Sequence, residues 1–156
     1  MTPLELLEEH GSLVRHLIRM HLGTGPDADD AYQEIYINLH RGWAGFRGAS
    51  QARTWLYRVA LNTLLTQHRR QAIRRTEPLE NHEHASPVVP QHEQRDLLEK
   101  ALETLSPVER SLIALHLEGF DYGEIADIFG IPPGTVGVRI HRIKKKITAW
   151  IQHPST

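Results

Sequence analysis

The sequence predicts an all-α protein with two small helical domains joined by a flexible linker. Apolar residues recur at helical spacing along almost the whole chain, and no alternation typical of a β-strand persists. The exception is residues 76–95, where prolines and polar side chains follow no apolar period, as is typical of a linker. Because 40% of the 156 residues are hydrophobic, both sides of this linker can form packed cores. The expected domains are therefore residues 1–75 and residues 96–153.

Three helices are expected in the N-terminal domain. The first covers about residues 4–18 with a break near Gly11, the second about residues 27–43, and the third about residues 50–73. Acidic residues open the second helix, where the helix dipole favours negative charge. Its apolar side is expected to carry Tyr32, Ile35, Tyr36 and Leu39. In the third helix, the expected buried face holds Leu56, Val59, Ala60 and Leu64, and the opposite polar face holds Arg58, Asn62 and Arg69.

The aromatic residues before the third helix allow two interpretations. Trp43, Phe46 and Trp55 lie within the stretch GWAGFRGASQARTW, and next to a basic helix face they could stack on unpaired bases. They could equally be core residues, and for Trp55 we favour the core because it lies at a helix start.

Local signals define the helices of the C-terminal domain. LLEKALETLSPVERSLIALHLEG predicts two helices, the second opened by Ser106, Pro107 and Glu109, which match an N-cap, a first-turn proline and a capping-box glutamate. Asp121 and Glu124 predict a second capping box at the start of the next helix.

The stretch GFDYGEIADIFGIPPGTVGVRIHRIKKKI has the pattern of a helix-turn-helix. Gly130 can supply a left-handed turn after the first helix, Pro133 can open the second, and the small Ala126 allows the two helices to cross closely. The second helix has an apolar stripe of Val136, Ile140, Ile143 and Ile147. Basic residues occupy its other faces, so it can enter the major groove of DNA.

Charge is segregated along the chain although the net charge is only −1. Seven arginines and no acid lie in residues 47–75, and five bases and no acid lie in residues 139–146. Phosphates respond to the local potential, so a near-neutral total is compatible with nucleic-acid binding. A single basic run can also be an ordinary solvated helix face.

Several functional classes are not supported. The chain has no cysteine, which excludes thiolate zinc sites and disulfides, and no catalytic triad or phosphate-binding glycine loop is recognisable. We expect no cofactor and no enzymatic activity.

Acids in the first residues and charges within every apolar stretch argue against a secretory signal or a membrane span, which favours a cytoplasmic protein without membrane insertion. A metal-responsive role for His82, His84 and His92 is conceivable, although flexible histidines are usually only solvated.

Three ordered motifs resemble one family. DADDAYQEIYINLHRGW, then FRGASQARTWLYRVALN, and, after the linker, LSPVERSLIALHLEGFDYGEIADIFGIPPGTVGVRIHRIKKKI are similar to segments of the extracytoplasmic-function (ECF, group IV) sigma factors of the sigma-70 family. The resemblance covers nearly the whole chain except the linker. It implies a region 2 domain that binds core RNA polymerase and melts the −10 promoter element, and a region 4 domain that recognises the −35 element.

The resemblance also implies site residues by position. Core polymerase would be bound through its β′ clamp helices and β flap, the clamp helices by Asp30, Gln33, Glu34 and Asn38. The −10 element would be bound by Phe46, Arg47, Ser50, Arg58, Asn62, Arg69, Arg70 and Arg74. The −35 element would be bound by Thr135, Val138, Arg139, Arg142, Lys145 and Lys146.

Some positions depart from the family pattern. Gly137 and Val138 replace a basic or polar residue and a small polar residue, so −35 recognition is expected to rest more on DNA shape. Gln51 and Ala52 replace the usual aromatic residue after the loop serine.

Two further interpretations concern function and control. Asp30, Gln33, Glu34 and Asn38 form a polar ridge beside the apolar side of the second expected helix. A stand-alone helix-turn-helix regulator would explain the C-terminal domain but would not need this ridge. Because the chain has no recognisable sensor domain, we expect a separate anti-sigma protein to hold it inactive.

Overall fold

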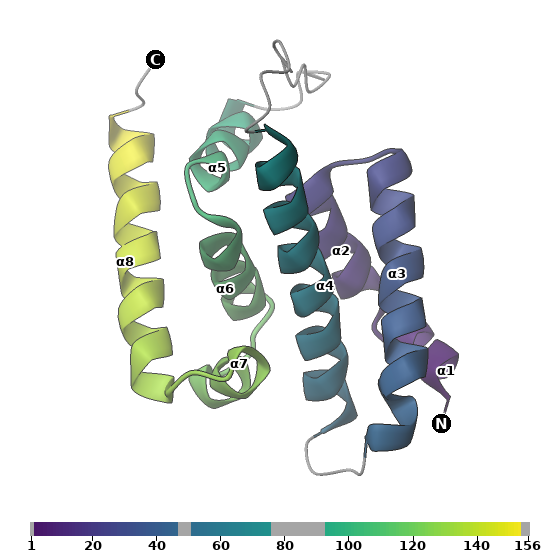
Figure 1. Cartoon of the computed structure of the whole chain (residues 1–156). Coiled ribbons are helices and arrows are strands. Elements are labelled where there is room, and N and C mark those ends of the chain that lie inside the picture. The colour runs from purple at the N-terminus through teal and green to yellow at the C-terminus, as the bar shows by residue number, and fades with distance from the viewer. Residues whose placement is uncertain (1, 47–50, 76–92, 154–156) are drawn as a thin grey trace.

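The computed structural model describes residues 2–46, 51–75 and 93–153, and within them it contains helices and no strand. The all-α prediction is confirmed. The N-terminal half contains α1 (Pro3–Glu9), α2 (Gly11–Leu22), α3 (Pro26–Gly42), the 3-10 turn η1 (Trp43–Gly45) and α4 (Ala52–Arg75). The C-terminal half contains α5 (Glu93–Glu103), α6 (Pro107–Leu117), α7 (Tyr122–Phe129) and α8 (Pro133–Gln152) (Figure 1).

The helix boundaries follow the local signals in the sequence. The predicted break near Gly11 is present, since α1 ends before His10 and α2 begins at Gly11. At α6, Ser106 and Glu109 form the predicted capping box. Gly130 has the left-handed conformation, with φ 69°, that ends α7, and Pro133 opens α8. The helix-turn-helix prediction for α7 and α8 therefore has its expected local geometry.

The capping box predicted for α7 forms on one side only. The side chain of Asp121 accepts a hydrogen bond from the backbone N–H of Glu124 at 2.8 Å. The carboxylate of Glu124 does not complete the box, because it forms an ion pair with Arg53 of α4. A contact between the two halves of the chain thus replaces a local one.

Helix α4 lies in the middle of the molecule. Figure 1 shows α2 and α3 on one side of it and α6 on the other, and α4 contacts α1, α2, α3, α6 and α7. The buried residues of both halves form one continuous apolar cluster. The fold is therefore two helical groups packed directly against each other across α4.

This position changes the predicted faces of α4. Leu56, Ala60 and Leu64 are fully buried as predicted, and Val59 is half-buried. Tyr57 and Leu61, which the predicted face omits, are only 2% exposed. For Tyr57 the reason is the C-terminal half, because its ring meets Phe120 edge-on, with centroids 5.3 Å apart. Burial raises the pKa of Tyr57 to about 12.

A histidine of α2 joins the two halves at a second point. The Nε2 of His21 lies 2.7 Å from the Ser111 hydroxyl of α6, and its Nδ1 lies 2.9 Å from Nε2 of His68 in α4. Ser111 donates its proton to the Pro107 carbonyl, so this network is completed when a neutral His21 donates from Nε2 and accepts at Nδ1. Burial, together with the nearby His68 and Arg110, lowers the pKa of His21 to about 3.

We expect this histidine to make the packed structure sensitive to acid. The unfolded chain binds a proton at His21 below its ordinary pKa of 6.5, whereas the folded chain remains neutral there until the pH approaches 3. The stability contributed by neutral His21 is therefore present above pH 6.5 and is lost as the pH falls below it. Between about pH 7.5 and about pH 5.5, the free energy of unfolding should fall by about 1.4 kcal/mol from this group alone.

Urea denaturation at the two pH values measures this loss. His21→Leu should remove it, and His16→Gln, at an exposed position of the same helix, should retain it. An equal pH dependence in wild type and His21→Leu would contradict the assignment.

Candidate functional site

Two residues of the polar ridge predicted on α3 are exposed, and the other two form hydrogen bonds with α4. Asp30 and Gln33 are exposed. Asn38 is half-buried and donates to the Thr63 hydroxyl of α4 at 3.0 Å. Glu34 accepts a hydrogen bond from Gln67 at 2.8 Å. Two of the four ridge residues thus also fasten α3 to α4.

Glu34 has a second partner on α4. A guanidinium nitrogen of Arg70 lies 3.7 Å from its carboxylate, and both side chains are substantially exposed. Such a pair contributes little to stability in water. It places a predicted polymerase-binding acid next to a predicted DNA-binding base.

An apolar groove beside the ridge was missed by the sequence analysis. It lies between α1 and α3 and is lined by Leu4, Leu7, Tyr32, Gln33, Tyr36 and Ile37. Leu4 is 47% exposed, and Ile37 is 45% exposed. Tyr36 was predicted on the packed side of α3, but it is 37% exposed and lies in this groove, whereas Ile35 and Leu39 are fully buried. An apolar surface next to exposed carboxylates suits a protein partner with apolar and basic side chains.

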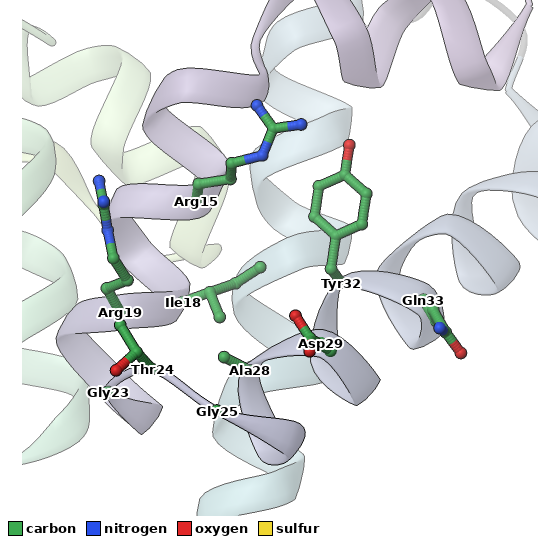
Figure 2. A pocket seen from close by; sticks show the side chains of 10 residues that line it. All are labelled: Arg15, Ile18, Arg19, Gly23, Thr24, Gly25, Ala28, Asp29, Tyr32 and Gln33. Atoms are coloured by element: carbon green, nitrogen blue, oxygen red, sulfur yellow. The ribbon is translucent and has the colours of Figure 1, made fainter.

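A second hollow, of about 500 Å³, continues from the ridge towards α2. Figure 2 shows Arg15 and Arg19 of α2 and Tyr32 of α3 extending towards the same side of it. The guanidinium carbon of Arg15 lies 5.2 Å from the centre of the Tyr32 ring. Tyr32 and Gln33 line both hollows, so the surface around the ridge is continuous.

The aromatic residues before α4 form one cluster. Phe46 stacks on Trp55 with centroids 5.1 Å apart, and Trp43 lies 5.9 Å from Phe46 and 5.8 Å from Trp55. Trp43 and Trp55 pack against the apolar core, which agrees with the core interpretation of Trp55. Phe46 is half-buried at the edge of the cluster. Its two neighbours in the predicted −10 site, Arg47 and Ser50, lie outside the described residues.

The basic face of α4 is only partly open. Asn62, Arg69 and Arg70 are exposed. Arg58 instead donates to the backbone carbonyl of Asp127 in α7. The side chain of Arg74 lies outside the described part of the chain. The structure therefore brings Asn62 and Arg69 into an open position and holds Arg58 against the C-terminal half.

Helix α8 separates its apolar and basic residues as predicted. Val136, Ile140 and Ile143 are buried, and Ile147 is half-buried against the core. Val138 is 51% exposed, Thr135 is half-buried, and Arg139, Arg142 and Lys145 are exposed. Lys146 is paired with Glu109 of α6 at 2.8 Å, so it also links α8 to α6.

Tyr122 is a candidate that the sequence analysis did not single out. A Cβ atom added at Gly137 would lie 3.3 Å from the Tyr122 ring. The ring therefore lies over the position of α8 at which glycine provides no side chain. Tyr122 is 41% exposed and also contacts the ring of His116, with centroids 5.8 Å apart. An aromatic side chain from α7 thus occupies the space next to Gly137 on α8.

Comparison with known proteins identifies the family. The family model described as Sigma-70 region 2 matches residues 6–74, and the one described as Sigma-70, region 4 matches residues 95–147. The ECF RNA polymerase sigma-E factor of Escherichia coli K12 is 33% identical, and the alignment covers 89% of this chain and 81% of that protein. The chain belongs to the ECF sigma factors. The ECF RNA polymerase sigma factor SigM of Mycobacterium tuberculosis is 29% identical, and the alignment covers 97% of this chain and 78% of that protein.

Solved structures have the same fold. The sigma factor RpoE of Bartonella quintana, determined in complex with the anti-sigma factor NepR, matches with a TM-score of 0.72 and 20% identity over 97% of this chain and 99% of that one. CnrH, determined in complex with the cytosolic domain of CnrY, matches with a TM-score of 0.69 and 20% identity. The match covers 98% of this chain and 89% of the CnrH chain. As an ECF sigma factor, the chain is an RNA polymerase sigma factor, and a stand-alone regulator is not favoured.

The described residues contain neither a membrane-spanning helix nor a cluster of metal-binding side chains. No helix among them has the length and apolarity required to cross a membrane. Within residues 2–46, 51–75 and 93–153, no three potential metal-binding side chains gather at one place.

The divided ridge of this sigma factor predicts two different effects on stability. Asn38→Ala removes a half-buried hydrogen bond and should lower the free energy of unfolding by about 1 kcal/mol. Asp30→Ala, at an exposed position of the same helix, should change it by less than about 0.5 kcal/mol. Urea denaturation of both variants tests this, and equal effects would show that Asn38 does not fasten α3 to α4.

Proposed function

We propose that the exposed ridge of α3, with the apolar groove beside it, is the surface that binds core RNA polymerase. The proposal rests on one observation: Gln33 lines the groove with exposed Leu4, Tyr36 and Ile37, and exposed Asp30 precedes it by three residues on the same face of α3. Apolar contacts supply the association energy, and the carboxylates select a basic partner and orient it. The β′ clamp helices are the proposed partner of this surface, and the β flap is the proposed partner of the C-terminal domain.

The two basic surfaces are proposed to bind promoter DNA at separate elements. Phe46 with Arg58, Asn62, Arg69 and Arg70 is suited to an unpaired −10 strand, because aromatic rings stack on bases and guanidinium groups bind phosphates. Helix α8 is suited to the −35 major groove through Thr135, Val138, Arg139 and Arg142. Tyr122 would contribute to the −35 contact where Gly137 has no side chain.

The domain limits and the remaining properties are also proposals. Residues 1–75 would form region 2, residues 76–95 the linker, and residues 96–153 region 4. The protein would act in the cytoplasm with RNA polymerase and would have no catalytic activity of its own. An anti-sigma protein is a further proposed partner, because the sigma factor RpoE of Bartonella quintana, which has the same fold, was determined in complex with the anti-sigma factor NepR.

Binding to core polymerase tests the proposed ridge. The double variant Asp30→Ala/Glu34→Ala should bind core polymerase roughly thirtyfold or more weakly, the effect expected for an interface hot spot of about 2 kcal/mol. Glu8→Ala/Glu9→Ala removes two exposed acids of α1 and is the matched control. Fluorescence titration with core enzyme provides the affinities, and circular dichroism checks that helicity is intact. Unchanged affinity of the ridge variant would refute the proposal.

Promoter binding tests the proposed recognition helix. If Arg139 contacts a base edge, Arg139→Ala should cost roughly 1–3 kcal/mol on the cognate promoter and relax discrimination at one position. Lys145→Ala should instead weaken binding to all sequences equally, as expected for a phosphate contact. Holoenzyme binding to a promoter set with single changes in the −35 element measures both. A uniform loss for Arg139→Ala would make Arg139 a phosphate contact too.

A further inference from the structure

Val138 is an apolar side chain on the polar side of α8. It follows Val136 of the buried stripe by two residues, which places it about 200° away around the helix. Val138 is 51% exposed, whereas Val136 is fully buried. The next residue, Arg139, and Arg142, one turn after Val138, are exposed cations. Val138 therefore lies outside the packed face and within the basic surface that α8 would present to DNA.

The ring of Tyr122 lies beside this part of α8. Its Cε2 and Cδ2 atoms are 3.3 and 3.5 Å from the place that a Cβ atom of Gly137 would take. The ring also contacts the ring of His116 in α6, with centroids 5.8 Å apart. Asp121, the residue before it, caps α7 by accepting a hydrogen bond from the Glu124 N–H at 2.8 Å. The ring is thus held from several sides, and 41% of Tyr122 remains exposed.

The glycine at position 137 has a packing reason. Gly137 is not among the described glycines that have a positive φ, so its backbone conformation does not require glycine. Within a helix, glycine is less favourable than alanine. The Cβ atom of an alanine, however, would make an unusually close contact with the Tyr122 ring. Gly137 therefore preserves the place of this ring, immediately before Val138 in α8.

Apolar groups in a major groove have one chemical partner among the base edges. All four bases present hydrogen-bond donors or acceptors there, and only thymine adds an apolar group, its C5-methyl. A valine side chain and the carbon atoms of an aromatic ring have neither donor nor acceptor, so they favour that methyl group. Burying one such group changes the affinity about fourfold. Phosphate contacts, by contrast, favour all sequences alike.

We propose that the Val138 side chain and the Tyr122 ring form an apolar reader, which recognises thymine in the −35 element by its C5-methyl group. Gly137 is a positioning residue, because it leaves room for the ring. The inference rests on the proposed −35 role of α8, and it adds the chemical group that the helix selects. Recognition is then direct at this position, where the sequence predicted more dependence on DNA shape.

Replacement of thymine by uracil tests the apolar reader, because uracil lacks only the methyl group. Holoenzyme assembled from this protein and core polymerase first selects the tightest-binding duplexes from a promoter library randomised over the −35 element. Each −35 thymine of a selected duplex, on either strand, is then replaced singly by deoxyuridine, and fluorescence competition provides the affinities. At one or more positions the uracil duplex should bind about fourfold more weakly. Equal affinities at every −35 thymine, or selected duplexes without a T·A pair, would overturn the proposal.

A variant of the valine assigns the effect to its side chain. In Val138→Ser the thymine and uracil duplexes should bind equally at the sensitive position. Ile151→Ser is the matched control, since it removes an exposed apolar side chain near the other end of α8, and it should keep the fourfold difference. Each ratio compares two duplexes with one variant, so a general loss of stability does not alter it. A difference that persists in Val138→Ser would be an effect of the methyl group on DNA shape and would overturn the proposal.

Two variants of the tyrosine test the part of the ring. Tyr122→Phe keeps the ring and should retain the discrimination between thymine and uracil, whereas Tyr122→Ala should reduce it. A loss of affinity in Tyr122→Phe that is equal on all sequences would make the hydroxyl group a phosphate contact. With discrimination unchanged in Tyr122→Ala, the ring would be removed from the apolar reader.

The selection step separates this inference from the proposed −35 function. A holoenzyme that selects no −35 sequence would refute the proposed role of α8 and the apolar reader together. Selection of a defined −35 sequence without any difference between thymine and uracil would leave the role of α8 intact and refute only the reader.

Discussion

The burial of α4 on two sides is the constraint on which the rest of the structure depends. Leu56, Ala60 and Leu64 are fully buried in α4, and Tyr57 and Leu61 are almost so. A helix that buries side chains on two sides requires neighbours on both of them. The N-terminal helices provide one set, and α6 and α7 provide the other. The packing of α4 therefore fixes how the two halves meet, and it also fixes which of its basic residues remain exposed.

The sequence predicted the features that depend on near neighbours. The capping box of Ser106 and Glu109, the left-handed Gly130 and the apolar stripe of α8 each arise from residues within a few turns of one another. The burial of Tyr57 could not be predicted in this way, because its partner Phe120 lies far away in the sequence. Glu124 is a second example. Its spacing from Asp121 predicted a local hydrogen bond, but its carboxylate forms an ion pair with Arg53, which is distant in the sequence.

The candidate site was predictable as a set of positions but not as a set of contacts. Asp30 and Glu34 lie one helical turn apart, yet only Asp30 is free of α4. Arg58 and Asn62 are also one turn apart, and only Arg58 reaches α7. Helical spacing places each pair on one face, while neighbouring helices decide which member is available. The groove around Ile37 and the Tyr122 ring over Gly137 likewise required the position of a second helix.

The junction between the halves has the properties of a separable contact. Helices α5, α6 and α7 all pack on α8, and α1, α2 and α3 pack on one another as well as on α4, so each half keeps most of its own contacts when the other leaves. The exposed ion pair contributes only about 0.2–1 kcal/mol, and water can replace the partners of His21 and Arg58. The remaining cost is the exposure of the apolar junction around α4, which includes Tyr57 and Phe120. A partner that binds only the open form can supply that free energy, since a ligand shifts such an equilibrium by its difference in affinity for the two states.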